Sequence, residues 1–351
     1  MSRDQSNNQI TISRPITYYL LKWNAKIKSH RLKFLALWFL HTFKRRYFAV
    51  NFDPVLACNL RCKMCYFTDE NYVKTLKGSF TRDDLDIWAR QSLPQALKLQ
   101  VGCGAEPTVY KHLDRVFELG KQYGVPHISM TTNANLLTRD KLQKWVTNGL
   151  NEITVSLHGI YQDTYEEMMQ KGDYQKFHQA LELIADLKKT HPNLLLRINY
   201  TFNEDNFSEL KDFFKVFGKY GVDIIQIRPI SKIGETAYNN FSLDKIIPVY
   251  DTFIKDFKAQ AARYQTTLLA PASKDNLVQR ESDGSLIFNY TYFYVSPTHF
   301  WQKDFDWKHQ SFRDYTRQIG WGKQLFSNVF KSKKQLQHLL RDQNLNYDVN
   351  F

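Results

Sequence analysis

The sequence predicts an α/β fold built around a parallel sheet, and three observations support that prediction. Six short segments rich in β-branched and aromatic residues lie between Tyr47 and Ile230, segments with helical apolar spacing separate them, and the chain of 351 residues can bury a large core. Strands that alternate with helices pair in parallel through right-handed crossovers. Six such units fit an open doubly wound sheet or a partial barrel, and both folds gather ligands at the carboxyl ends of the strands.

The predicted elements follow one another in order along this core. Each strand is a short apolar, β-branched or aromatic run, and the helices are marked by a capping residue such as Thr81 or Thr138 or by a terminating glycine such as Gly149. The predicted strands are residues 47–55, 98–104, 125–133, 151–159, 194–203 and 222–230, and the predicted helices are residues 81–97, 109–123, 138–149, 162–189 in two pieces, 207–221 and 242–264.

Composition indicates a globular chain with an excess of positive charge. Hydrophobic residues make up 43% of the sequence, and the net charge of +13 would suit nucleic acid, anionic lipid or an acidic protein partner. The polar start of the chain does not resemble a secretory signal, and the longest apolar run, residues 32–43, is shorter than the roughly 20 residues that a bilayer span needs. We therefore expect no transmembrane helix.

Residues 1–46 form a predicted helical segment that mixes basic and apolar side chains. One interpretation is an amphipathic helix that lies on an anionic membrane. The other is a helix packed on the rest of the protein with its basic face in water, and the second is favoured because any surface helix shows this alternation. The basic residues near the apolar run are Lys22, Lys26, Lys28, His30, Arg31, Lys33, Lys44, Arg45 and Arg46.

Three of the four cysteines lie within eight residues, in the stretch CNLRCKMC. Cys58, Cys62 and Cys65 follow the first predicted strand, at the edge of the sheet where such folds bind ligands. Clustered thiols in a reducing cytosol indicate a soft metal and not a disulfide framework. A zinc site would need a fourth ligand from another strand end, such as Cys103 or His158. Three cysteines can instead hold three irons of a cubane cluster and leave the fourth iron open.

The Cys-x3-Cys-x2-Cys spacing after a first strand resembles the radical S-adenosylmethionine (SAM) enzyme family. The resemblance covers about residues 47–230 and implies a partial (β/α)6 barrel of the radical SAM type. It also implies that Cys58, Cys62 and Cys65 bind a 4Fe–4S cluster whose unique iron chelates SAM. In the family, an electron from the cluster cleaves SAM to a 5′-deoxyadenosyl radical, which abstracts hydrogen from a substrate. An electron donor such as flavodoxin or ferredoxin is implied as a partner.

The same resemblance implies a set of SAM-binding residues at the strand ends. The stretch GCGAEPT is similar to the Gly-Gly-Glu-Pro stretch of the family, although Ala105 precedes the glutamate, and Glu106 would receive the SAM ammonium group. Arg197 would offer its planar fork to the SAM carboxylate, with Asn199 on the same face of the strand. The remaining expected contacts are Gly104, Asn133 in TTN, Ser156 in SLHG, Arg228 in IQIRPI, and Met64 and Tyr66 beside the adenine.

The sequence divides into a basic N-terminal segment (residues 1–46), a radical SAM core (47–235) and an aromatic-rich C-terminal extension (236–351). Many peptide-modifying relatives carry a cysteine-rich extension there, but no cysteine follows Cys103, which excludes a cysteine-bound auxiliary cluster. Aromatic and basic residues can stack on nucleic-acid bases. A small core that caps the open side of the barrel is the favoured interpretation.

We expect a cytoplasmic radical SAM enzyme acting on an unidentified substrate. The faint C-terminal resemblance favours a peptide or protein. The alternatives are a carbohydrate, lipid or other small molecule handled near a membrane, where the basic segment would make a peripheral contact with the inner face, and a non-catalytic iron–sulfur protein that binds SAM. Nucleic acid is not the expected partner, because charge alone suggests it.

Overall fold

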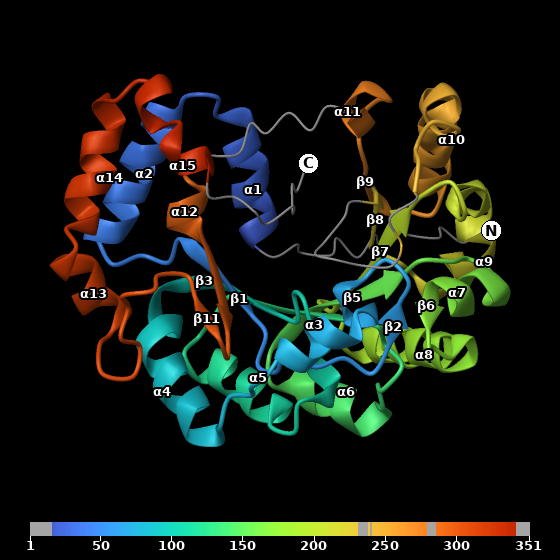
Figure 1. The fold of residues 1–351 in the computed structure, drawn as a ribbon, viewed down its shortest axis with the longest axis horizontal. Helices are drawn as coiled ribbons and strands as arrows, with labels where there is room; N and C mark the ends of the chain where they lie inside the picture. The colour runs from blue at the N-terminus through green and yellow to red at the C-terminus, as the bar shows by residue number, and fades with distance from the viewer. Residues whose placement is uncertain (1–15, 231–237, 239–240, 279–285, 342–351) are drawn as a thin grey trace, which may run out of the picture.

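The structure is a computed structural model that describes residues 16–230, 238, 241–278 and 286–341 (Figure 1). Its centre is a nine-stranded sheet with the strand order β11-β10-β1-β3-β4-β5-β7-β8-β9, and β2 pairs with β6 in a separate two-stranded sheet. The strands are β1 (Phe48–Phe52), β2 (Arg61–Cys62), β3 (Ala96–Val101), β4 (His127–Thr132), β5 (Leu150–Leu157), β6 (Met169–Gln170), β7 (Leu195–Phe202), β8 (Ile224–Pro229), β9 (Thr267–Leu269), β10 (Tyr292–Ser296) and β11 (His299–Phe300).

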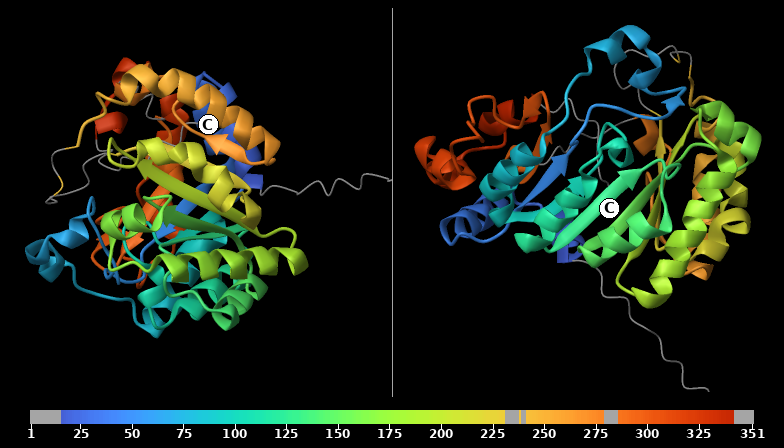
Figure 2. Two further views of the ribbon diagram at one scale, coloured as in Figure 1. Left: turned by 90° about the vertical axis from the view of Figure 1, so that its right-hand side faces the viewer. Right: turned by 90° about the horizontal axis from the view of Figure 1, so that it is seen from below.

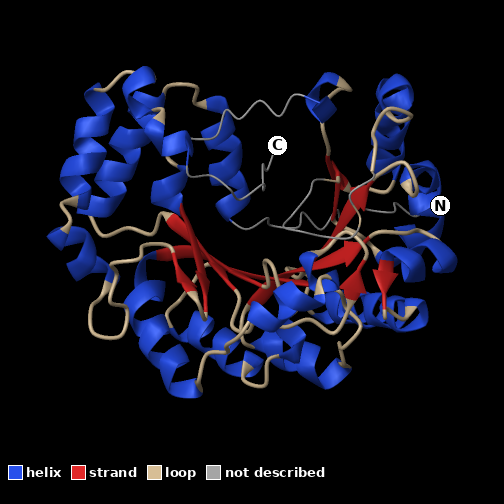
Figure 3. Ribbon diagram, in the orientation of Figure 1, coloured by secondary structure: helices blue, strands red, loops and turns tan. Residues whose placement is uncertain are grey.

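All six predicted strands are present, as β1, β3, β4, β5, β7 and β8, and each pairs in parallel with its neighbour. Within the described residues the sheet curves into an open arc whose two edges are β11 and β9 (Figure 3). The expectation of a partial α/β barrel with parallel strands is therefore confirmed.

The helices lie mainly on the convex side of the arc, where the apolar faces of the strands are buried (Figure 1). Phe52 of β1 stacks on Trp88 at a ring distance of 3.9 Å, for example. The helices are α1 (Ile16–Lys26), α2 (His30–Thr42), α3 (Glu70–Thr75), α4 (Arg82–Ser92), α5 (Leu113–Gln122), α6 (Arg139–Thr147), α7 (Gln162–Met168), α8 (Tyr174–Thr190), α9 (Phe213–Phe217), α10 (Ile247–Arg263), α11 (Asp275–Val278), α12 (Phe288–Thr291), α13 (Phe312–Gln318), α14 (Trp321–Phe330) and α15 (His338–Arg341).

Two helix predictions were wrong in their extent. The helix expected over residues 81–97 begins after its Thr81 cap but ends at Ser92. Pro94 lies in a short 3₁₀ turn that follows, and Ala96 already begins β3. The helix expected over residues 207–221 is mostly 3₁₀, with α-helix only at Phe213–Phe217.

The two ends of the chain complete the arc. The C-terminal strand β10 adds to the outer side of β1 in parallel, with Val50 opposite Phe293. Helix α2 packs against α14, and α10 lies beside β9 at the other end of the arc (Figure 2). Helix α1 enters the concave side of the sheet (Figure 1). No helix within the described ranges is long and apolar enough to cross a bilayer.

Candidate active site

The cysteine loop follows β1 and is held in place by pairing with a distant segment. Arg61 and Cys62 form β2, which pairs antiparallel with Met169 and Gln170 of β6. The Cys65 amide donates to the Cys62 carbonyl at 2.8 Å, which folds the loop into a turn. This pairing fixes the direction of the loop, so its thiols stay at the carboxyl end of the sheet.

One cavity of about 260 Å³ opens at this edge of the sheet and gathers most of the predicted site residues. The three cysteines share it with the glycine-rich loop after β3, the TTN stretch at the end of β4 and the ends of β5 and β8. Its predicted lining residues are Cys58, Met64, Cys62, Cys65, Tyr66, Gly104, Ala105, Glu106, Asn133, Ser156 and Arg228, and Cys103 and His158 line it too. Loops far apart in sequence thus converge where a parallel sheet binds its ligand.

The chemistry of the three thiols fits an iron–sulfur cluster. All three are free, partly buried and without a disulfide. Burial raises the pKa of each thiol, and the charge of Cys65 raises the pKa of Cys58 and Cys62 further. All three side chains line the same cavity. No group of three or more His, Cys, Asp or Glu side chains in the described residues is arranged to hold a single ion. A cubane cluster is different, because each of its cysteines ligates a separate iron.

The glycine-rich loop is anchored by Asp53, a residue that the sequence analysis missed. Its carboxylate accepts hydrogen bonds from the amides of Cys103 (2.7 Å) and Gly104 (2.9 Å) and from the hydroxyl of Tyr294 (2.8 Å). Gly104 needs to be glycine, because a Cβ there would lie 2.8 Å from the hydroxyl oxygen of Tyr66, which donates to its carbonyl. The buried Asp53 follows β1 and precedes a proline, and its acidic side chain in an apolar strand context was the available signal.

Glu106 is almost fully buried, at 3% exposure, and is strongly hydrogen-bonded. Its Oε1 accepts from the Thr108 amide, the Thr108 hydroxyl and the Thr132 hydroxyl, and its Oε2 accepts from the Asn133 amide at 2.7 Å. Burial raises the pKa of Glu106, and these hydrogen bonds counteract that effect. A carboxylate oxygen has about two lone-pair directions, so Oε2 can accept one further donor from the cavity.

His158 and Arg228 form the opposite wall of the cavity. Burial, and then the charge of Arg228, lower the pKa of His158 to about 4, so the imidazole is neutral near pH 7. Its Nδ1 is buried and has no hydrogen-bond partner within the part of the chain that the structure describes. The Arg228 Nε donates to Thr201 at 3.3 Å. His158 therefore contributes an uncharged polar ring to the lining of the cavity.

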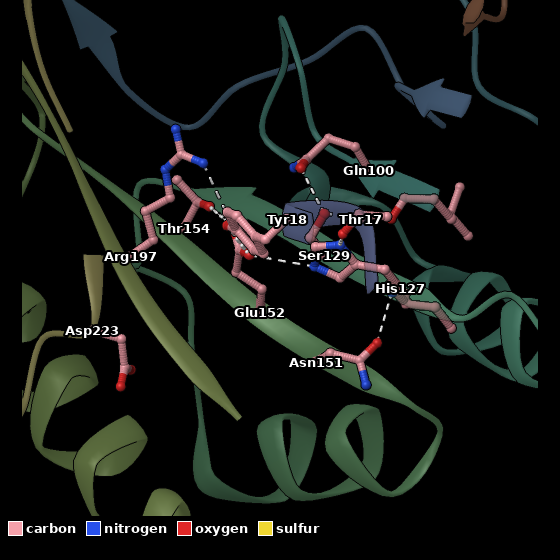
Figure 4. Close-up of polar contacts among 12 residues, drawn as sticks. Thr17, Tyr18, Gln100, His127, Ser129, Asn151, Glu152, Thr154, Arg197 and Asp223 are labelled. Carbon is pink, nitrogen blue, oxygen red and sulfur yellow. Dashed lines mark hydrogen bonds and ion pairs between the residues drawn. The ribbon is translucent and has the colours of Figure 1, made fainter. Parts of the chain in front are cut away.

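Below the cavity, the concave face of the sheet carries a polar floor, consisting of Tyr18, His127, Glu152 and Arg197 (Figure 4). The buried Glu152 accepts a hydrogen bond from the Tyr18 hydroxyl at 2.5 Å and contacts His127 Nε2 at 3.3 Å. Burial opposes ionisation of Glu152, but the contact with His127 and the charges of Lys98 and Arg197 hold its pKa well below the usual range. Glu152 is therefore a carboxylate that ties α1 to β5.

Arg197 and Asn199 share the inner face of β7, as their alternation with Ile198 predicted. Arg197 Nε donates to Asn199 Oδ1 at 2.9 Å, and the guanidinium also donates to Gln226 and lies 3.8 Å from Glu152. Neither Arg197 nor Asn199 is among the residues that line the cavity. The guanidinium contacts the polar floor, and its predicted role toward the SAM carboxylate stays a prediction.

Sequence reasoning missed further residues that complete this arrangement. Thr132 and Thr108 orient Glu106, and Tyr18 and His127 belong to the polar floor. Thr132 carried a usable signal, since it lies in the TTN stretch at a strand end. The pairing of Tyr18 with Glu152 spans 134 positions and has no local signature.

An open, mostly parallel α/β arc with a three-thiol loop and a glycine-rich loop at one edge defines a cofactor-binding fold. A family model described as the radical SAM superfamily matches residues 54–227, from the end of β1 into β8. Residues 54–227 are therefore a domain of the radical SAM superfamily, a family of enzymes that use a 4Fe–4S cluster and SAM.

Curated relatives resemble this chain over part of their length. The GTP 3′,8-cyclase of Clostridium botulinum is 27% identical over 205 residues, which are 56% of this chain and 62% of the cyclase. A probable GTP 3′,8-cyclase of Saccharolobus solfataricus is 25% identical over 188 residues, which are 52% of this chain and 57% of the relative. The chain therefore spans about three-fifths of the length of these relatives.

Solved structures resemble the fold over a larger share of the chain. Streptococcus suis SuiB bound to the precursor peptide SuiA matches with a TM-score of 0.58 at 15% identity, covering 97% of this chain and 79% of SuiB. The native anSMEcpe structure with bound AdoMet matches with a TM-score of 0.56 at 15% identity, covering 86% of this chain and 93% of anSMEcpe. At these identities the likeness concerns the fold.

Proposed function

We propose that the protein is a radical SAM enzyme that abstracts hydrogen from a peptide or protein substrate. The observation that carries the proposal is that Cys58, Cys62 and Cys65 line one cavity together with the glycine-rich loop and Glu106. In this proposal residues 47–235 form the catalytic core, and residues 1–46 and 236–351 are additions to it.

In this proposal different residues of the chain bind the cluster and SAM. The three thiols lose their protons as they bind iron, since metal ligation requires thiolates. Glu106 offers Oε2 to the SAM ammonium group, while Thr132 and the Asn133 amide hold the carboxylate in place. The chemistry that the cluster and SAM supply when bound is reductive cleavage of the sulfonium bond followed by hydrogen-atom abstraction from the substrate.

The remaining predicted contacts complete the SAM site in this proposal. In this proposal the sugar and amino-acid portions of SAM contact Ser156, Asn133, Gly104 and Ala105. The adenine of SAM contacts Met64, Tyr66 and Arg228. Arg197 and Asn199 lie outside the cavity lining, in contact with the polar floor. In this proposal the positive charge of Arg197 attracts the carboxylate group of SAM.

Two facts support a peptide or protein substrate. SuiB, whose fold matches 97% of this chain, was solved with a precursor peptide bound. That match extends beyond residues 54–227 and so takes in the C-terminal extension. Residues 236–351 contain no cysteine, so in this proposal they supply no thiolate to a second cluster.

A small-molecule substrate is the second candidate, because the relatives that match the core by sequence are named for a reaction of GTP. A non-catalytic SAM-binding protein is the third. In each case we propose a reducing cytosol, an electron donor such as flavodoxin or ferredoxin, and a peripheral contact between the basic N-terminal segment and the inner face of a membrane.

The test is anaerobic reconstitution with iron and sulfide, followed by reduction in the presence of SAM. We expect about four irons per chain and formation of 5′-deoxyadenosine. Cys58→Ala, Cys62→Ala and Cys65→Ala should each lose both, whereas Cys103→Ala, the matched control in the same cavity, should keep most of the iron. An intact cluster that forms no 5′-deoxyadenosine would contradict an enzymatic role.

The substrate class is tested separately with the active enzyme. Precursor peptides encoded beside the gene, and GTP, are compared for substrate-dependent stimulation of 5′-deoxyadenosine formation, and products are identified by mass spectrometry. Stimulation by GTP and not by peptides would overturn the peptide proposal while leaving the radical SAM assignment intact.

A further inference from the structure

Two helices from opposite ends of the chain expose a continuous row of aromatic rings. Phe39 on α2 and Phe43, the residue that caps the end of α2, are 46% and 65% exposed. Phe326 and Phe330 on α14 are 43% and 69% exposed. Residues four apart lie on one face of a helix, so each pair forms a short stripe. We call these four phenylalanines the aromatic surface.

Contacts between the rings make the aromatic surface continuous. The partly buried Trp38 lies 5.0 Å from Phe39 and 5.0 Å from Phe326, so it joins the two stripes. Phe39 stacks on Phe43 at 6.1 Å, and Phe326 contacts Phe330 at 5.3 Å. The helices pack side by side (Figure 1).

The helices are antiparallel, which places basic residues at both ends of the aromatic surface. His30 at the start of α2 contacts the Lys331 carbonyl just after α14, at 3.0 Å. At the other end, the exposed Lys44 and Arg45 directly follow α2. Basic residues therefore lie at both ends of the helix pair that carries the aromatic surface.

The charge of the whole chain is concentrated in these same segments. Residues 16–52 contain 8 lysines and arginines and no acidic residue, and residues 315–341 contain 6 and no acidic residue. The rest of the chain has 34 basic and 35 acidic residues, so these two segments account for the net charge of +13. An aromatic face bounded by uncompensated positive charge is complementary to a bilayer with anionic headgroups.

We propose that the aromatic surface, with the basic residues at its two ends, docks the protein on an anionic membrane, and that α14 contributes as much to this contact as α2. The inference deepens the peripheral contact proposed above, which invoked only the N-terminal segment, and it does not depend on SAM chemistry. Phenylalanines would enter the headgroup region while lysines and arginines meet lipid phosphates and carboxylates.

The observations favour lipid over nucleic acid. Single-stranded nucleic acids bind to aromatic rings whose faces are open for stacking in a basic groove. On the aromatic surface the rings of Phe39 and Phe43 are already parallel to each other, at 5°. Both rings are exposed on a helix pair and not in a groove, which suits a flat apolar phase.

The experiment compares sedimentation of the full chain with phosphatidylcholine vesicles and with vesicles that also contain phosphatidylserine. We expect binding to the anionic vesicles that weakens as salt is raised. Phe326→Ser/Phe330→Ser and Phe39→Ser/Phe43→Ser should each weaken this binding by about tenfold or more, since each removes two apolar anchors. Lys333 and Lys334 are exposed just after α14, so Lys333→Glu/Lys334→Glu should also weaken binding to the anionic vesicles. Val249→Ser, a matched control 50% exposed on α10, should bind like the parent.

Each other outcome overturns the inference in a recognisable way. Undiminished binding by the α14 variant would leave only the N-terminal contact, and equal binding to neutral vesicles would remove the role of charge. If the parent chain bound no lipid but bound RNA, and the phenylalanine variants lost that binding, the surface would be a nucleic-acid site. If the parent chain formed a dimer that the variants lost, the surface would be an interface with a second copy. Formation of 5′-deoxyadenosine is measured in every variant, and its retention separates failure of docking from failure of the proposed enzyme.

Discussion

At the scale of single residues, the cavity residue His158 makes the stability of the folded protein depend on pH. Burial and the charge of Arg228 lower its pKa from 6.5 to about 4. Above pH 6.5 both the folded and unfolded protein hold a neutral ring. As the pH falls from 6.5 towards 4, the unfolded chain binds the proton first, so folding stability is lost in this window.

We therefore predict that His158→Gln loses less stability between pH 7.5 and pH 5.5 than the parent protein does. The difference should be roughly 1 kcal/mol, from the size of the pKa shift. Urea unfolding at the two pH values measures it. A parallel pH dependence of His158→Gln and the parent would show that the ring is not held neutral.

Much of the candidate site could be predicted from local sequence, and the exceptions have a physical reason. Cys58, Cys62, Cys65 and Glu106 lie in short motifs at strand ends, so their meeting in one cavity follows from parallel pairing. The partners of Arg197 could not be predicted. Its contacts with Glu152 and Gln226 depend on the register between neighbouring strands, which alternation alone leaves undetermined.

At the scale of elements, all six core strands followed from composition, whereas helix ends and helix type did not. Pro94 ends α4 early because it cannot continue the hydrogen bonding of the helix. The stretch from Phe207 has helical periodicity, but it adopts mostly 3₁₀ turns under tertiary packing. Similarly, the contact of α2 with α14 joins segments nearly 300 positions apart, and no local pattern indicates it.

Helix α1 is attached to the sheet by hydrogen bonds of its side chains, and a single substitution can test their contribution. Its Tyr18 hydroxyl donates to the buried Glu152 carboxylate at 2.5 Å, and its Thr17 hydroxyl is 2.6 Å from His127 Nδ1. We predict that Tyr18→Phe costs roughly 1.5–3 kcal/mol of unfolding free energy, the range for a hydrogen bond to a charged group. Urea unfolding measures this cost.

The neighbouring Tyr19 provides a matched control for that substitution. It is 53% exposed, so Tyr19→Phe should change the unfolding free energy by less than about 0.5 kcal/mol. Limited proteolysis should also cut near α1 sooner in Tyr18→Phe than in Tyr19→Phe, because the helix is less firmly held. Equal stability of the two variants would mean that other contacts hold α1.

At the scale of the whole molecule, the C-terminal extension shares a hydrophobic core with β1, the strand that precedes the radical SAM domain. Phe293 of β10 is 1% exposed and contacts Phe48 of β1 at a ring distance of 4.4 Å. It also stacks on Trp301 at 4.0 Å and lies 5.6 Å from Phe312. Because β10 hydrogen-bonds to β1, which leads directly into the cysteine loop, we expect the extension and the core to unfold together.

Phe293→Ala tests this coupling. Removing a buried phenylalanine should cost roughly 3–5 kcal/mol, and in the reconstituted protein the loss of far-ultraviolet circular dichroism and the loss of cluster absorbance should shift together to lower temperature. Phe330→Ala, which is 69% exposed, should leave both transitions in place. If Phe293→Ala produced a separate early transition while cluster absorbance stayed unchanged, the extension would be an independently folded unit, and its pairing with β1 would not stabilise the candidate site.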